Sequence, residues 1–181
     1  MASNLAQKVS GNAKVAITDI NSVINGVRTL SLCNIHAADT VTVDLYIASQ
    51  VTADVTSTTV VAAETEAAST SSVTLTVKTV DATADALLDE RIYKSDGTLF
   101  GTCTAVSSTT EIVFSGGLDN AITNNNVLFT GTRYYVLKSY VLPANATLVL
   151  ERDELRFDSS IYKMYIKLSA ADSTVDIITR K

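Results

Sequence analysis

The last third of the chain, residues 133–181, alternates between apolar and polar side chains with a period of two. Over 161–168 the apolar set is Tyr162, Met164, Ile166 and Leu168. Residues 174–180 repeat the pattern with Val175, Ile177 and Thr179. A period of two places successive side chains on opposite faces of a strand, so each of these strands has one apolar face. The pattern predicts an antiparallel sheet that is packed on one face.

Composition supports an all-β fold for the whole chain. Hydrophobic residues make up 46% of the 181 residues and charged residues 18%, which excludes a charge-rich disordered protein. A chain of this length can bury a sizeable core as one domain or as two small ones. Thr, Ser, Val and Ala dominate, and this mixture of β-branched and small polar residues is typical of strands joined by short turns.

Charge and hydropathy exclude two classes of partner. The net charge of -5 and the sequence pI of about 4.8 predict repulsion from phosphate backbones, so no nucleic-acid partner is expected. No apolar run approaches the roughly 20 residues that a membrane helix needs, so no membrane association is expected. The N-terminal segment has no basic region followed by an apolar one, unlike a secretion signal, and residues 1–13 are expected to form a polar arm.

The expected organisation is an insertion of one module into another. Alternating strands over 27–35 and 40–48 share their pattern and spacing with those of 133–181, and neither set alone completes a sandwich. Together, 14–52 and 133–181 hold about eight strands, which fits one antiparallel β-sandwich of jelly-roll or immunoglobulin-like type. Residues 53–132 are then an inserted module, because the ends of a surface loop lie close together.

The inserted segment predicts a small barrel-like module. Its first part, 49–72, loses the alternation, and 60–68 within it is expected to be a loop or one weak strand. Five short strands are expected after it, at 72–80, 90–94, 98–106, 110–114 and 127–130. Ser95-Asp96-Gly97 has the composition of a hairpin turn. Five short strands in about 60 residues are typical of a small five-stranded barrel.

Three stretches resemble proteins of tailed bacteriophages. Two of them are VINGVRTLSLCNIHAADTVTVDLYIA and RYYVLKSYVLPANATLVLERDELRF. They resemble small β-sandwich proteins of the virion, with Cys33-Asn34 and 143–150 at the corresponding places. The third, LLDERIYKSDGTLFGTCTAVSSTTEIVF, looks like a phage-associated barrel unit whose hairpin glycines match Gly97 and Gly101.

The resemblance implies a non-enzymatic structural protein of the virion, such as a capsid decoration, neck or tail component. Its implied partners are other virion proteins and further copies of itself. The alternative is a carbohydrate-binding or cell-surface-binding β-sandwich of a tail fibre or adhesin. That alternative predicts exposed aromatic side chains, and the absence of Trp weakens it.

Tests for a chemical site give no catalytic, cofactor or metal residues. His36 is the single histidine, and Cys33 and Cys103 are far apart, so no zinc site of usual spacing can be drawn. The two cysteines are either free thiols or a disulfide. Carboxylates gather at 81–90 and 151–158, where solvated turns are favoured over a glycosidase pair or a calcium site at Asp81, Asp85 and Asp89.

Strand parity predicts an interface instead. In 133–142, Tyr135 and Val141 fall on one parity, and Tyr134 and Tyr140 on the other. Six residues on the polar parity of their strands are large and apolar or aromatic: Tyr46, Tyr134, Tyr140, Ile161, Tyr165 and Ile178. Tyrosine is common at interfaces because its ring buries well and its hydroxyl can stay hydrogen-bonded. These residues are covered either within the monomer or by a neighbouring subunit.

Overall fold

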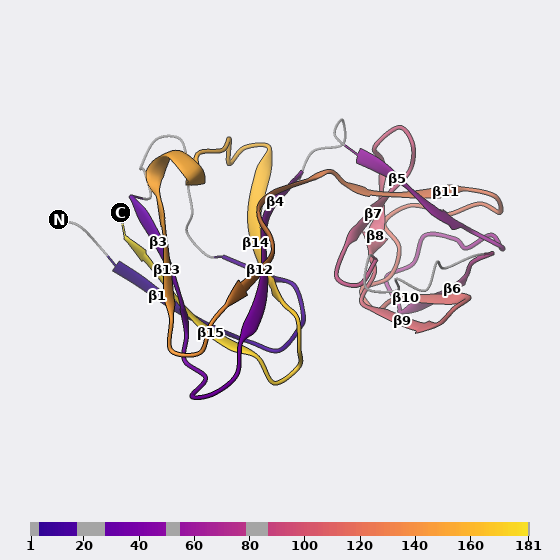
Figure 1. Ribbon diagram of the computed structural model, residues 1–181. Coiled ribbons are helices and arrows are strands. Elements are labelled where there is room, and N and C mark those ends of the chain that lie inside the picture. The colour runs from indigo at the N-terminus through magenta and orange to yellow at the C-terminus, as the bar shows by residue number, and fades with distance from the viewer. Residues whose placement is uncertain (1–3, 18–27, 50–54, 79–86, 181) are drawn as a thin grey trace. The chain divides into compact units, whose positions relative to one another are not determined.

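The computed structural model describes residues 4–17, 28–49, 55–78 and 87–180 (Figure 1). The chain divides into two compact units, one made of 1–48 with 133–181 and the other of 49–132. Every strand pairing in the described parts of both units is antiparallel. The prediction of an all-β, antiparallel protein is therefore confirmed for the described residues.

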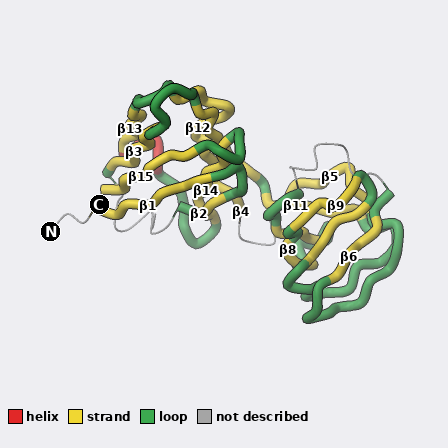
Figure 2. The backbone as a smooth tube through the Cα atoms, turned by 90° about the horizontal axis from the view of Figure 1, so that it is seen from below, coloured by secondary structure: helices red, strands yellow, loops and turns green. Residues whose placement is uncertain are grey.

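The described residues of the first unit form two four-stranded sheets. Sheet A has the order β1-β15-β3-β13, and Figure 2 shows these strands side by side. Their bounds are Asn4–Ser10 for β1, Thr174–Arg180 for β15, Thr29–Asn34 for β3 and Thr147–Glu151 for β13. Sheet B has the order β12-β4-β14-β2. Its strands are β12 (Arg133–Leu142), β4 (Val41–Ser49), β14 (Tyr162–Leu168) and β2 (Val15–Ala16).

The two sheets share one core, as the alternation predicts. The fully buried side chains include Leu30, Leu32 and Val175 from sheet A and Val43, Leu45 and Ile166 from sheet B. In β14 and β15 the side chains predicted to be inward are buried, except that of Tyr162, which is half-buried against the core. A short 3-10 helix, η2 (Arg152–Leu155), adds Leu155 to the same core. The unit is thus a sandwich-like pair of packed sheets.

The N-terminal segment differs from the expected polar arm. Residues 4–10 form β1, which pairs with β15 along its whole length. Val9 is buried in the core, and the Gln7 side chain donates a hydrogen bond to the Ala16 carbonyl oxygen (3.0 Å). Backbone pairing with β15 holds this strand, and its side chains are mostly polar. The sequence pattern therefore did not predict it. The expected turn at Asn25-Gly26 lies outside the described residues.

The described part of the second unit holds seven strands in two sheets. The four-stranded sheet has the order β5 (Val55–Val61), β11 (Val127–Gly131), β7 (Arg91–Tyr93), β8 (Leu99–Thr102). The three-stranded sheet has the order β6 (Val73–Thr76), β10 (Glu111–Phe114), β9 (Ala105–Ser108). Their shared core includes Leu75, Ile92, Phe100, Ile112, Phe114 and Leu128.

The expectation of a five-stranded barrel is wrong, because the described strands close no barrel. The expected strand at 98–106 is two strands, and the chain changes sheets between them. The Cys103 amide donates to the Glu90 carbonyl (2.9 Å), whereas the next amide, of Thr104, donates to Val113 (2.7 Å). In addition, β5 lies mostly before 60–68, the segment where a loop or one weak strand was expected.

Two glycines of this unit have a left-handed backbone, which disfavours a side chain. Gly97 has a φ of 82° in the predicted hairpin turn between β7 and β8. Gly117 has a φ of 85°, and a Cβ there would lie 2.0 Å from the Ser69 carbonyl oxygen. Its neighbour Gly116 has open space around it.

Gly117→Ala is expected to destabilise the protein by more than about 2 kcal/mol, because a left-handed backbone and a steric overlap act together. Gly116→Ala is the matched control and should change the free energy of unfolding by less than about 0.5 kcal/mol. Chemical denaturation of both variants measures the difference. Equal stabilities would contradict the close approach of Ser69 and Gly117.

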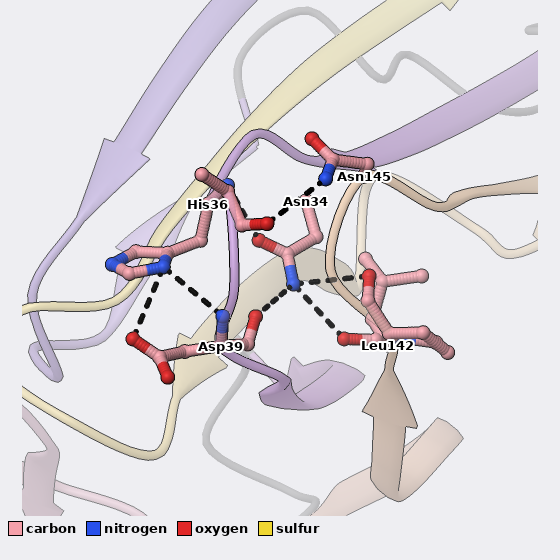
Figure 3. A network of polar contacts seen from close by, with 7 residues as sticks. Asn34, His36, Asp39, Leu142 and Asn145 are labelled. Atoms are coloured by element: carbon pink, nitrogen blue, oxygen red, sulfur yellow. Dashed lines mark hydrogen bonds and ion pairs between the residues drawn. The ribbon is translucent and has the colours of Figure 1, made fainter.

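Asn34 joins two loops at one end of the sandwich (Figure 3). Its buried side-chain nitrogen lies 2.9 Å from the Asp39 carbonyl, 3.0 Å from that of Leu142 and 3.1 Å from that of Pro143. Its side-chain oxygen accepts a hydrogen bond from the His36 amide (3.0 Å). The Cys33-Asn34 and 143–150 stretches, which carry the phage resemblance, therefore meet through this side chain as well as through the pairing of β3 with β13.

Asn34→Ala is expected to lower the free energy of unfolding by about 1–3 kcal/mol, since it leaves buried carbonyl groups without a donor. Asn120→Ala is the control. The Asn120 side chain is exposed and donates one bond, to the Leu99 carbonyl oxygen (2.8 Å). Thermal denaturation should separate the two variants, and an unchanged midpoint for Asn34→Ala would contradict the bridging role.

Candidate interaction surface

Three tyrosines lie side by side on the outer face of sheet B. They come from neighbouring strands: Tyr135 from β12, Tyr46 from β4 and Tyr165 from β14. The ring of Tyr46 lies 5.4 Å from that of Tyr135 and 5.9 Å from that of Tyr165, between centroids. Tyr46 is only 1% exposed although it faces away from the core. The row is therefore a packed aromatic layer on the outside of the sheet.

Each ring of this row has a cation over it. Lys138 Nζ lies 4.1 Å from the ring centre of Tyr135, and Lys14 Nζ lies 4.8 Å from that of Tyr165. Arg133 covers Tyr46 at 5.2 Å. A ring attracts a cation through its quadrupole, which is worth about 0.5–1 kcal/mol at exposed sites. The aromatic row therefore collects positive charge on this face.

We name this surface the basic face. Its cations are Lys14, Arg133, Lys138, Lys163 and Lys167, where the last two flank Tyr165 on β14. The strands of sheet B carry one carboxylate, Asp44, which pairs with Lys138 at 3.6 Å. The Tyr135 side chain first, and the Asp44 carboxylate after it, raise the pKa of Lys138. Lys138 therefore keeps its charge at neutral pH.

Asp44 also holds an irregularity in β12. Its carboxylate accepts a hydrogen bond from the Ser139 amide (2.6 Å), and Ser139 has a φ of 50°. The pairing of β12 with β4 shifts register on both sides of Leu137. Such bulges re-aim the side chains that follow them. The shift between Tyr135 and Leu137 places Tyr135 opposite Tyr46 and Leu137 opposite Leu45, so Tyr135 lies on the outer face, opposite to its parity in the sequence.

β12 is an edge strand with an exposed aromatic surface. Among the described strands it pairs with β4 alone. Four of its large side chains remain exposed: Tyr134 (49%), Tyr135 (39%), Tyr140 (38%) and Val141 (54%). Exposed apolar side chains beside unpaired backbone groups are characteristic of a site that pairs with another chain. Tyr135 and Val141 stand opposite Tyr46 and Thr42, and Tyr134 and Tyr140 stand opposite Ile47 and Val43, so the four lie on both sides of this edge strand. We name these four residues the β12 surface.

The six expected interface residues fall in different places. Tyr134 and Tyr140 are exposed on β12, whereas Tyr165 and Ile161 are half-buried. Tyr46 is buried by its own chain, so it cannot be a contact residue of a neighbour. Ile178 is exposed on the other sheet.

Ile178 lies on the outer face of sheet A, where its neighbours differ from those of the tyrosines. It stands opposite Ser31, which stands opposite the exposed Val149 on the next strand.

Sequence parity did not find Tyr135, Val141 or the cations of the basic face. The bulges of β12 reverse the parity of the first two, and the cations come from strands far apart in the sequence.

Other residues singled out in the sequence have local structural roles. Both cysteines are free, and burial raises the pKa of the Cys103 thiol to about 11. His36 lies 3.1 Å from the Asp39 carboxylate in the turn that Asn34 holds. The Glu154 carboxylate accepts a hydrogen bond from the Glu151 amide (2.9 Å), as turn residues do. Asp81 and Asp85 lie outside the described residues.

Two further classes of site are absent from the described part of the chain. No group of three or more His, Cys, Asp or Glu side chains there could hold a metal ion. No helix within those ranges has the length and apolar character needed to span a membrane. The surface of sheet B is therefore the strongest candidate site among these residues.

Tyr46→Ser is expected to destabilise the fold by about 3 kcal/mol, because it removes a buried ring from the aromatic row. Tyr140→Ser removes an exposed ring and should cost less than about 1 kcal/mol. Urea denaturation of both variants measures this contrast. Equal losses of stability would contradict the different burial of the two rings.

Comparison with known proteins adds no relative to this picture. No protein-family model, no curated protein and no solved structure matches the chain. The function is therefore proposed from the surface of sheet B together with the phage resemblance of the three sequence stretches.

Proposed function

We propose that this chain is a non-enzymatic structural protein of a tailed-phage virion. In this role it docks on a capsid or on a tail or neck assembly and contacts neighbouring copies. The observation that supports the proposal most is the β12 surface, which combines a strand edge left open by the described strands with three exposed tyrosines and a valine. Such an edge promotes association when it is left uncovered, and a virion lattice would cover it.

The architecture supports the same role. The first unit would be a sandwich of jelly-roll or immunoglobulin-like type, which docks, and the second unit would reach a neighbour. Many weak contacts in a symmetric particle add up, because each bound copy raises the effective concentration of the next contact. The chain therefore needs no single high-affinity site to stay on the particle.

A carbohydrate-binding sandwich is the second candidate, and the aromatic row of sheet B favours it. Sugars stack on exposed aromatic rings, and Tyr135 offers one. Tyr46, however, is buried beneath Arg133 and its neighbours, so the row presents little flat ring surface. Binding on a glycan array that Tyr135→Ala abolishes would favour this candidate over the structural one.

The direct test is peptide mass spectrometry of tailed particles purified from the source that encodes the chain. We expect the chain in many copies per particle, at a fixed ratio to the major capsid or tail protein. Its absence from particles, with abundant protein in the same lysate, would overturn the proposal.

Substitution of the β12 surface gives a second prediction. A Tyr140→Ser, Val141→Ser variant should be incorporated into particles at a clearly lower level, because it removes the exposed apolar contact. Val149→Ser is the matched control, since Val149 is 51% exposed but lies on sheet A. Quantitative mass spectrometry of particles that carry each variant measures incorporation. Equal incorporation of both variants would contradict a role for β12.

A further inference from the structure

The two units carry opposite net charges. Residues 49–132 contain ten carboxylates and three Lys or Arg residues, a net charge of -7. The rest of the chain contains nine carboxylates and eleven Lys or Arg residues, a net charge of +2. The overall value of -5 therefore hides a strongly acidic inserted unit attached to a mildly basic sandwich.

Within the sandwich, the positive charge is concentrated on one sheet. The strands of sheet A carry Lys8 and Arg180 against Asp176 and Glu151, and Lys8 stands directly opposite Asp176. By the same count, the strands of sheet B carry four cations of the basic face, Arg133, Lys138, Lys163 and Lys167, and the single carboxylate Asp44. The strands of sheet A are thus balanced, whereas those of sheet B have an excess of three positive charges, and Lys14 lies next to β2.

The tyrosine row does not cancel this excess. A ring holds a cation by its quadrupole and contributes no net charge. The ion pair of Lys138 with Asp44, in contrast, does neutralise charge on this face. Lys163 is exposed on β14, next to the row. The face therefore suits a partner that supplies several carboxylates.

The inserted unit offers such carboxylates at its surface. The Glu64 carboxylate accepts a hydrogen bond from the Thr76 amide, and Glu111 stands opposite Thr76 on the neighbouring strand. Hydrogen bonding from Thr76 lowers the pKa of Glu64, so this group stays ionised at neutral pH. Glu111 and Asp119 are exposed.

We propose that the basic face of one copy binds the acidic inserted unit of a second copy, head to tail. This inference rests on the proposed function, because it names the neighbour that a virion protein contacts. The contact joins two different surfaces, so repeating it builds a ring if the rotation closes and a filament if it does not. It adds a polar contact to the apolar β12 surface beside it.

The test uses the full-length protein in sedimentation velocity at low and high ionic strength, about 0.02 M and about 0.5 M. Wild-type protein should associate at low salt and dissociate at high salt. Lys163→Glu with Lys167→Glu should weaken association at least tenfold, because like charges then face each other. Glu111→Lys with Asp119→Lys should do the same from the other side of the contact.

Mixing the two double variants is the sharpest step. Each variant keeps the surface that the other has lost, so a mixture should form a 1:1 complex although each variant alone is monomeric. Arg152→Glu with Arg156→Glu is the matched control, since it makes the same change in net charge at exposed positions outside sheet B. This control should associate like wild-type protein.

Several results would overturn the inference. A monomer at both salt concentrations, association that the lysine variant leaves unchanged, or a mixture that stays monomeric would each do so. Salt-dependent capture of heparin by a monomer, through the same lysines, would make the basic face a site for a foreign polyanion instead. The particle experiment above is independent of all these results, so the failure of either proposal can be recognised separately.

Discussion

The structure of the first unit depends on the packing of two sheets that each combine both ends of the chain. Sheet A places β1 and β3 among β13 and β15, and sheet B places β2 and β4 among β12 and β14. Neither end can bury its apolar faces without the other. The inserted unit begins and ends where β4 and β12 run side by side, with the Ser49 amide bonded to the Thr132 carbonyl (3.0 Å). The antiparallel ladder thus brings together the two points at which the insertion enters and leaves.

This arrangement also explains how a functional surface arises without a catalytic constellation. The strand order β12-β4-β14-β2 aligns three tyrosines from three strands, and their rings gather Lys14, Arg133 and Lys138. The register shift between Tyr135 and Leu137 places Tyr135 in that row, opposite Tyr46. A surface of this kind recognises charge and shape, which agrees with the structural role proposed for the chain.

Local alternation predicted the strands whose side chains alternate clearly, such as β4, β14 and β15. Turn composition predicted the hairpin turn at Gly97. Alternation missed β1 and β5, whose polar side chains are ordered by backbone pairing. It also missed the change of sheet at Cys103, where two successive amides bond to different strands. The basic face could not be predicted from the sequence, because its cations are scattered over 14–167 and only the strand order of sheet B brings them together. Parity fails along β12: Tyr135 and Val141 stand opposite Tyr46 and Thr42, whereas Tyr134 and Tyr140 stand opposite Ile47 and Val43 on the core side of β4.

Hydrogen exchange of β12 tests most directly whether this edge is a subunit contact. The amides of β12 that point away from β4 have no ladder partner among the described strands, so they should exchange quickly under conditions where the protein is monomeric. In the associated protein, or in the particle, the account predicts that β12 peptides exchange at least tenfold more slowly, whereas β13 peptides stay unchanged. Association without any added protection in β12 would contradict it.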